Sequence, residues 1–292
     1  MNTKWLIPIL LIGMVLLSSC SLITDLFKDD NYTPQNTSQT HNTTTNTSQT
    51  NTPKNNKFEI DTDYTNVILL DTKEGESTLI YTADGYLVLI DSGADPAKVL
   101  AELRDLGVAK LSYMVSTNPE REYSSGLDII ALKHHPTLIY QSGLKSPYVD
   151  AYSRISNTSN VLSETLLPSY DPLLLIPPYS SGFSEDNNLN SIMVELRDNI
   201  LLMGGCNEGC EGVIKGLTFK LLSIPRVCPS VSFSYLVQSN VSTIIFPGKG
   251  PICDELLDEM STLGLTYYDM EQTGDIQIIF KEDEPEINFQ KR

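Results

Sequence analysis

Two stretches of sequence decide the fold: VILLDTKEGESTLIYTADGYLVLIDSG at residues 67–93 and LSYMVSTNPEREYSSG at residues 111–126. The first stretch holds three short runs rich in β-branched and aromatic residues, separated by glycine-containing turns. This pattern predicts three successive β-strands, at Val67–Leu70, Ser77–Tyr81 and Tyr86–Ile90. The third predicted strand leads into an acidic turn that begins with Asp91.

A helix is predicted between the two stretches. Asp95 suits the N-cap position and Pro96 the first helical position. Apolar residues then recur at helical spacing until Gly107, which suits a helix end. The second stretch predicts a strand at Leu111–Ser116 that ends in the polar run Thr117–Gly126. The order is therefore strand, acidic turn, helix, strand and polar loop.

Strands and helices continue to alternate along the rest of the chain. Helices are expected at residues 126–135, 231–238 and 254–263, and strands at residues 137–141, 200–203, 217–224, 243–246 and 275–280. Residues 148–178 are hard to interpret and are expected to form a short helix followed by an apolar connection. Residues 285–292 are expected to be a frayed, charged tail. The alternation predicts parallel strands with helices covering the sheet.

This ordered set of segments resembles the metallo-β-lactamase fold, and most closely the lactamase-like domain of competence-type DNA-uptake proteins (ComEC-like). In that family a first strand carries the motif Leu-Asp-Val-Gly-Gln-Gly-Asp-Ser, and the matching positions here are Leu70, Asp71, Gly75, Glu76 and Ser77. The family's Leu-Ile-Asp-x-Gly is matched by residues 89–93. The resemblance implies an α/β fold, a four-layer αββα sandwich, over a domain at residues 58–284.

The resemblance also implies where zinc ligands would stand. The family carries Thr-His-x-His-x-Asp-His after the predicted strand at residues 111–116, a bridging aspartate in Thr-Gly-Asp, and later His-His-Gly and Gly-His-Pro loops. Matching this chain to those motifs puts other residues at the ligand positions: Asn118, Glu120, Glu122, Tyr123, Gly205, Arg226-Val227-Cys228 and Lys249-Gly250-Pro251. Only Asp91 is kept from the family's set, and the resemblance implies that it supports the site from a turn.

These substitutions predict that the chain has no metal cofactor and no catalytic residues of the family type. Zinc requires imidazole, thiolate or carboxylate ligands, and the cation Arg226 would repel it. We hypothesise that Arg226 instead forms an ion pair with Glu120 or Glu122, the alternative being that all three are solvated loop charges. A second alternative is a weak calcium or magnesium site built from Asp91, Glu120 and Glu122.

Other catalytic signatures are missing from the sequence. The chain has three histidines: His41 lies in a polar segment, and His134 and His135 end a predicted helix, where cations complement the helix dipole. Ser92 is not part of the Gly-x-Ser-x-Gly turn of a nucleophilic serine. The segment Gly248–Pro251 is interpreted as a strand-to-helix turn, with an anion cradle around Lys249 as the alternative.

Four of the five cysteines lie in the domain, at Cys206, Cys210, Cys228 and Cys253. An even number in an exported chain predicts disulfides. The resemblance places these cysteines on loops that face each other across the family's metal site. It favours Cys206–Cys228 with Cys210–Cys253, slightly over Cys210–Cys228 with Cys206–Cys253. A zinc site made of the four thiolates is the functional alternative.

The N-terminus predicts export and lipid anchoring. Residues 1–20 combine a positive charge at Lys4 with an apolar run that is short for a membrane span. The run ends in Leu17-Ser18-Ser19-Cys20, which resembles a lipoprotein lipobox with Cys20 as the lipidated residue. The alternatives are an ordinary signal peptide and an uncleaved anchor helix. We expect a protein held on the extracytoplasmic face of a cell membrane.

Residues 21–57 predict a disordered stalk. They are dominated by Asn, Thr, Ser and Gln and lack the apolar side chains that would offset the entropy of ordering. A flexible segment of about 30 residues reaches roughly 30 Å. Candidate N-glycosylation sequons occur in this stalk and in the domain, at Asn31, Asn36, Asn42, Asn46, Asn157 and Asn240.

The formal net charge of −17 limits the range of partners. Strong negative charge disfavours direct binding to nucleic acid or to anionic lipid. The sequence therefore predicts a cell-surface lipoprotein whose degenerate metallo-β-lactamase-like domain binds or scaffolds an envelope protein or ligand. One alternative is a metal-dependent hydrolase of nuclease or phosphodiesterase type with an atypical carboxylate site. Another is a structural envelope protein whose stalk and glycans matter more than its domain.

Overall fold

The structure is a computed structural model that describes residues 58–141, 148, 161–162, 173–176, 191–196, 199–206, 210–226, 231–281 and 284–290. The chain divides into the units Met1–Asn51 and Thr52–Arg292, and every described residue belongs to the second. The predicted signal peptide, Cys20 and the stalk sequons lie outside the described residues. Within the described part of the chain, no helix is both long and apolar enough to cross a membrane.

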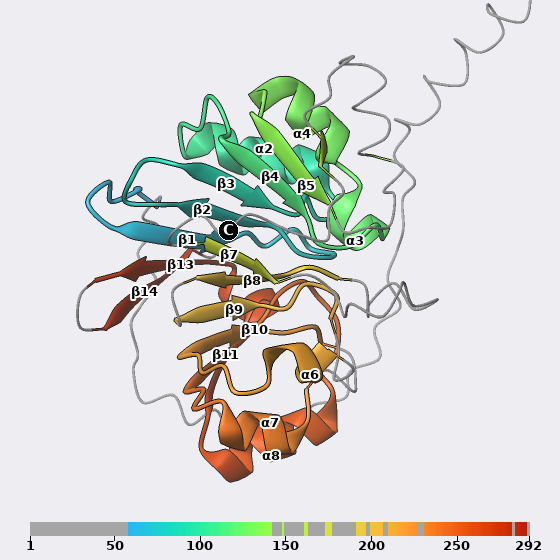
Figure 1. Cartoon of the computed structure of the whole chain (residues 1–292), viewed down its shortest axis with the longest axis vertical. Coiled ribbons are helices and arrows are strands. Elements are labelled where there is room, and N and C mark those ends of the chain that lie inside the picture. Colours follow the sequence, from blue (N-terminus) through green and yellow to red (C-terminus); the bar gives the residue numbers. More distant parts are fainter. Residues whose placement is uncertain are drawn as a thin grey trace, which may run out of the picture. The chain divides into compact units, whose positions relative to one another are not determined.

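Two β-sheets form the centre of the domain (Figure 1). The first sheet has eight strands in the order β14 (Pro285–Gln290), β13 (Asp275–Phe280), β1 (Thr65–Leu69), β2 (Thr78–Tyr81), β3 (Leu87–Ile90), β4 (Tyr113–Ser116), β5 (Leu138–Gln141) and β6 (Val161–Leu162). The second has six, in the order β12 (Thr266–Asp269), β11 (Thr243–Phe246), β10 (Leu221–Ser223), β9 (Ile200–Leu202), β8 (Met193–Leu196) and β7 (Leu173–Ile176).

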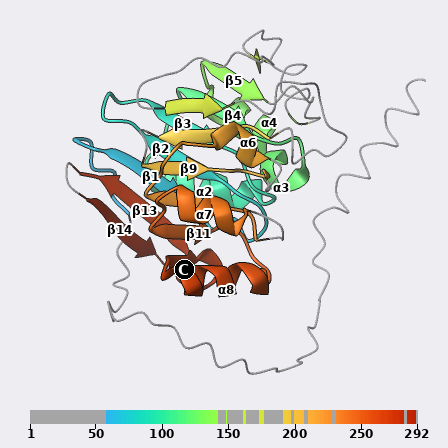
Figure 2. The same ribbon diagram turned by 60° about the horizontal axis from the view of Figure 1, so that its bottom comes forward.

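Helices cover the outer faces of both sheets (Figures 1 and 2). The first sheet is covered by α2 (Pro96–Asp105) and α4 (Leu127–His134), and the second by α6 (Glu211–Ile214), α7 (Phe233–Gln238) and α8 (Asp254–Leu263). Two single-turn helices, α3 (Arg121–Ser124) and α9 (Met270–Thr273), lie in connections. The predicted four-layer αββα sandwich is therefore confirmed.

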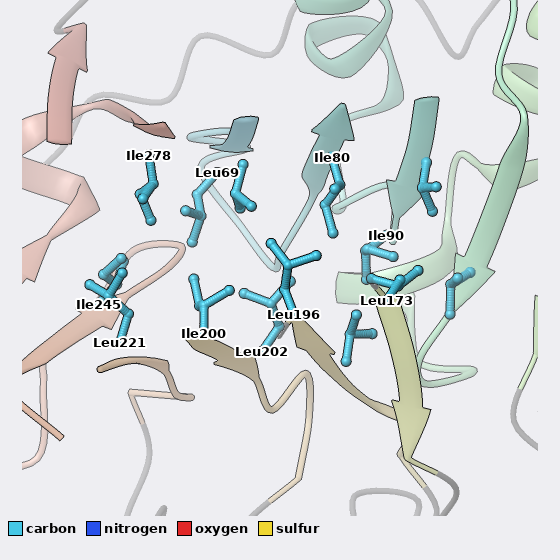
Figure 3. Close-up of a cluster of buried hydrophobic side chains, with 14 of the residues drawn as sticks. Leu69, Ile80, Ile90, Leu173, Leu196, Ile200, Leu202, Leu221, Ile245 and Ile278 are labelled. Atoms are coloured by element: carbon cyan, nitrogen blue, oxygen red, sulfur yellow. The ribbon is translucent and has the colours of Figure 1, made fainter. Parts of the chain in front are cut away.

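The alternation of apolar residues explains the layers. In β1, Val67 and Leu69 belong to the core between the sheets, whereas Ile68, and Leu70 just after the strand, pack under the helices of the first sheet. Successive side chains of a strand point to opposite faces, so a strand buried on both sides is apolar throughout. Figure 3 shows side chains of both sheets meeting in the central core.

Strand direction fixes where the polar loops gather. The strands β3 to β6 pair in parallel, and so do β9 to β12, as the alternation of strands and helices predicted. The carboxyl ends of parallel strands lie at one edge of a sheet. The loops that follow β3, β4, β9, β10 and β11 therefore emerge where the family's metal ligands were expected.

Local signals placed α2 correctly. The Asp95 carboxylate accepts a hydrogen bond from the backbone N–H of Lys98 at 3.2 Å, as an N-cap residue does. Gly107 has a positive φ of 75° and its N–H bonds to the carbonyl of Arg104 at 3.0 Å. The predicted beginning and end of this helix are confirmed.

Several elements differ from the prediction. The tail expected to be frayed contains β14, which pairs antiparallel with β13 along its whole length. In this strand apolar residues alternate with polar ones, and the apolar Ile287 and Phe289 pack against the central core. The polar and charged residues between them made the segment resemble a frayed tail. β12 was not predicted, and β10 is shorter than the strand expected at residues 217–224.

We predict that ending the chain at Glu284 destabilises the domain. The deletion removes Ile287 and Phe289 and uncovers the outer edge of β13. Loss of two large, half-buried side chains that pack against the core, together with the strand pairing, should lower the free energy of unfolding by about 3–5 kcal/mol, measured by urea denaturation. A chain that lacks only residues 291–292 is the control and should keep its stability. Equal stability of both truncations would contradict the role given to β14.

Candidate functional site

The rim is our name for the loops at residues 71–77, 91–94, 117–126, 203–206, 224–226 and 247–253. Backbone groups of these loops touch directly. The N–H of Glu76 bonds to the carbonyl of Glu122 at 3.1 Å, and the N–H of Ser92 bonds to the carbonyl of Tyr123 at 2.7 Å. Gly75 has φ +74°, and a Cβ there would lie 1.7 Å from the carbonyl oxygen of Glu122. Only glycine allows this approach.

Asp91 organises the rim from a buried position. Its backbone is left-handed, with φ 58°, and its side chain is 1% exposed. One carboxyl oxygen accepts from the backbone N–H of Thr117 at 2.8 Å and the other from the Thr117 hydroxyl at 2.5 Å. The Ser77 hydroxyl donates to the Asp91 carbonyl at 3.0 Å. Asp91 therefore fixes the start of the polar loop, which is a supporting role like the one expected from the resemblance.

Carboxyl groups crowd the centre of the rim. Burial raises the pKa of Asp91 to about 8, against the lowering effect of the Thr117 hydrogen bonds. Burial, and then the charge of Asp91, raise the pKa of Glu76 well above its usual range. The pKa of the Tyr123 hydroxyl is raised by burial and then by four nearby carboxylates: Glu76, Asp91, Glu122 and Glu120. The buried centre of the rim therefore favours protonated carboxyl groups at Asp91 and Glu76, whereas Glu120 and Glu122 are exposed at its surface.

Asn118 connects the two sheets at the position of the family's first histidine. Its side chain is fully buried, and its amide group donates to the Ser191 hydroxyl, which lies just before β8, at 2.9 Å. Its side-chain oxygen accepts from the N–H of Glu120 at 2.9 Å. Beside it, the N–H of Ile192 bonds to the carbonyl of Thr117 at 2.9 Å. Asn118 thus forms internal hydrogen bonds across the site.

Arg226 is buried at the end of β10 and bonds to the second half of the domain. Its side chain is 7% exposed, its Nε donates to the carbonyl of Pro247 at 2.9 Å, and one terminal nitrogen donates to the carbonyl of Gly250 at 2.6 Å. The other terminal nitrogen forms an ion pair with Asp269. Glu271 lies 3.9 Å from the guanidinium.

The hypothesis that Arg226 pairs with Glu120 or Glu122 is therefore wrong. The physical reason is that Asp269 ends β12, a parallel neighbour of β11, so it reaches the same sheet edge as Arg226. Glu120 and Glu122 are exposed in the polar loop instead. The run Thr266–Asp269, rich in β-branched and aromatic residues, was the sequence signal that could have revealed this partner.

The glycine turn after β11, where an anion cradle around Lys249 was the alternative, binds a carboxylate of the domain itself. The N–H of Gly250 donates to the Glu271 carboxylate at 3.0 Å. Gly248 has φ 69°, and a Cβ there would come within 3.2 Å of the Gly75 carbonyl oxygen. Lys249 is exposed. This agrees with the interpretation of residues 248–251 as a turn between β11 and α8.

The disulfide pairing expected from the resemblance is wrong. Cys206 and Cys210 form a disulfide with each other, with their Cα atoms 6.0 Å apart. The two cysteines are only four residues apart in the sequence, so the sequence neighbour is the partner within easiest reach. Cys253 is also disulfide-bonded, which contradicts its part in a thiolate zinc site. Cys228 lies outside the described residues.

The residues at the family's ligand positions do not fit a metal. Asn118 and Arg226 are committed to internal hydrogen bonds, and Gly205 has no side chain. In the described ranges, no group of three or more His, Cys, Asp or Glu side chains is arranged to hold an ion. His134 is buried at the end of α4, away from the ligand positions, and His135 caps that helix with φ 44°.

No protein-family model and no curated protein matches this chain. Solved structures do match. Igni18, a metallo hydrolase from the archaeon Ignicoccus hospitalis KIN4/I, is 14% identical over 74% of this chain and 100% of its own, with a TM-score of 0.49. A CmlA β-hydroxylase variant is 10% identical over 74% and 54%, with a TM-score of 0.50. A B3 metallo-β-lactamase with an active-site glutamic acid is 15% identical over 68% and 86%, with a TM-score of 0.37.

The domain thus has the two-sheet αββα architecture that the resemblance predicted. At these identities the likeness concerns the fold alone. Of the candidate glycosylation sites, only Asn240 is described, and it is exposed after α7 with φ 55°.

We predict that Arg226→Met strongly destabilises the domain. The change leaves the Asp269 carboxylate buried without its cation, which should cost about 3–5 kcal/mol in urea unfolding. The matched control is the double variant Arg226→Met/Asp269→Asn, which removes both charges and should recover part of the loss. If Arg226→Met unfolds like the unmodified domain, the ion pair does not hold the rim.

We also predict that the domain loses stability as pH rises. The folded pKa values of Asp91 and Glu76 are raised, so the fold favours their protonated forms. This stability is complete below the ordinary pKa of about 4 and is lost as pH rises toward about 8 for Asp91.

The free energy of unfolding, measured by denaturant titration, should fall between pH 5 and 8. The slope should be at most about 1.4 kcal/mol per pH unit for each group. The variant Asp91→Asn/Glu76→Gln removes both titrating groups and should therefore flatten this slope. It should still fold, because asparagine also tolerates the positive φ at position 91. A slope unchanged in the variant would show that other groups carry it.

Proposed function

We propose that this protein is a cell-surface lipoprotein, anchored through Cys20, whose domain binds or scaffolds an envelope protein or ligand and does not catalyse hydrolysis. The observation that carries the proposal is that two residues at the family's ligand positions hold the fold together. Asn118 ties the two sheets together, and Arg226 ties the ends of β10, β11 and β12 together. Side chains that hold the fold in this way are not available to bind metal or substrate.

The chemistry of the rim supports a binding role with a restricted class of partner. Glu120 and Glu122 are exposed around a half-buried Tyr123. Such a surface repels the phosphates of nucleic acid. A protein partner that presents hydrogen-bond donors or cations, with an apolar group to contact Tyr123, fits it better. We therefore propose that this chain shares the fold of the ComEC-like domains but does not bind DNA.

A metal-dependent hydrolase with a carboxylate site is the second candidate. The observation in its favour is that four carboxyl groups lie close enough to Tyr123 to raise the pKa of its hydroxyl: Glu76, Asp91, Glu120 and Glu122. Against it, both carboxyl oxygens of Asp91 already accept hydrogen bonds from Thr117. Phosphodiesterase or lactamase turnover that requires an added divalent cation would support this candidate.

The binding role predicts partners at the rim. A photo-crosslinking amino acid in place of Glu122, in the full-length protein in its native host, should give discrete adducts after irradiation. The same amino acid in place of Asp84, in the exposed turn between β2 and β3, is the control and should give none of those bands. Identical patterns from the two positions would contradict a partner at the rim.

The anchor is tested separately by fractionation. Cys20→Ser should move the protein from the membrane fraction to the soluble fraction and abolish labelling by a fatty-acid probe. An unchanged distribution and unchanged labelling would refute lipidation at Cys20. Because this test does not involve the rim, its failure would leave the crosslinking result to be judged on its own.

A further inference from the structure

The chain enters the domain at the end that carries the rim. Phe58 is buried in the core under the helices of the first sheet. Its backbone N–H donates to the side chain of Gln290 at 3.2 Å, and Gln290 is paired with Asp275 at the start of β13. The Asp275 carboxylate in turn accepts from the N–H of Asp71, a residue of the rim, at 2.6 Å. Phe58 therefore lies beside the rim end of β13 and β14.

From Phe58 the chain runs away from the rim before β1 brings it back. The carbonyl of Glu59 accepts from the side chain of Gln277, further along β13, at 2.7 Å. The backbone of Asp61 then exchanges two hydrogen bonds with the side chain of Asn66, which lies opposite the far end of β13. Gln277 and Asn66 are buried and bond to each other at 3.1 Å, so these contacts are costly to break. The residues before Phe58 are therefore joined to the domain on its rim side.

The size of the domain gives this attachment a consequence. The predicted stalk reaches roughly 30 Å as a flexible chain. A compact domain of the length of residues 58–290 has a radius of gyration of roughly 17 Å, and so a width comparable to that reach. The turn at Asp84 lies at the opposite end, because β2 runs away from the rim and β3 returns to it. An anchored chain holds its rim closer to the membrane than that turn.

We propose that the rim faces the membrane to which the chain is anchored and that its partner is a protein of that membrane, an inference that rests on the anchor and the binding role proposed above. Glu120 and Glu122 are exposed on the rim and repel anionic lipid, so the lipid surface itself is not the partner. A membrane protein that presents Lys or Arg side chains close outside the lipid headgroups matches their charge.

Energy transfer on vesicles tests the orientation without depending on Cys20. The chain from residue 21 onward, with a hexahistidine tag at its N-terminus, is bound to zwitterionic vesicles that contain a nickel-chelating lipid and an acceptor dye on the headgroups. A donor dye is attached through a non-natural amino acid that replaces either Glu122 or Asp84, both exposed. Transfer from position 122 should be at least twofold that from position 84.

A longer stalk is the matched control for this measurement. Insertion of a second copy of residues 28–57 should lower transfer from both positions and narrow the difference between them, because the domain is then freer to turn. Equal transfer from the two positions with the natural stalk, or greater transfer from position 84, would overturn the proposed orientation.

The kind of partner is tested in the native host. Adducts of the photo-crosslinking variant at Glu122 are identified by mass spectrometry, with the variant at Asp84 as the control. The protein crosslinked at position 122 should have a membrane-spanning segment or a lipid anchor of its own and should be absent at position 84. A soluble partner at position 122 would overturn this part of the proposal. Absence of any adduct would refute the binding role and its partner together, whereas the vesicle measurement still decides the orientation.

Discussion

Buried hydrogen bonds hold the two sheets together at the edge where the polar loops converge. Asn118 bonds to Ser191 across the gap between the first and second sheets, and the backbone of Thr117 bonds to Ile192 beside it. Asp91 in turn holds Thr117 through both carboxyl oxygens. Each bond contributes only about 1 kcal/mol net, but a buried partner left unpaired costs more. The rim therefore depends on the whole set being present.

Arg226 plays the equivalent role within the second sheet. It joins the loop after β11 to the end of β12, and Glu271 binds the same loop through the N–H of Gly250. The Cys206–Cys210 disulfide links the residues that follow β9 to the start of α6. Where the family resemblance places metal ligands, this chain thus has the amide of Asn118 and the guanidinium of Arg226, and a disulfide begins beside the Gly205 position. This substitution is the physical basis for proposing a binding protein with an acidic rim.

The sequence predicted features that depend on local pattern. The strands β1 to β4, the Asp95 cap of α2 and the acidic turn that begins at Asp91 follow from short runs and single residues. Features set by contacts between distant segments were predicted poorly. Arg226 was assigned to the wrong acid because its partner lies on β12, and β14 was overlooked because its apolar residues alternate with polar ones. The disulfide was misassigned because the prediction relied on the loop positions of the resembled fold. It gave too little weight to the closeness of Cys206 and Cys210 in the sequence.

The most direct test of this account is the metal content of the purified chain, measured by inductively coupled plasma mass spectrometry after exposure to zinc and gel filtration. The thermal unfolding midpoint of the same sample is then measured with and without a chelator. If hydrogen bonds and an ion pair hold the rim, no stoichiometric metal remains and the chelator leaves the midpoint unchanged. One or two tightly bound metal ions per chain, with a midpoint that falls on chelation, would contradict the account.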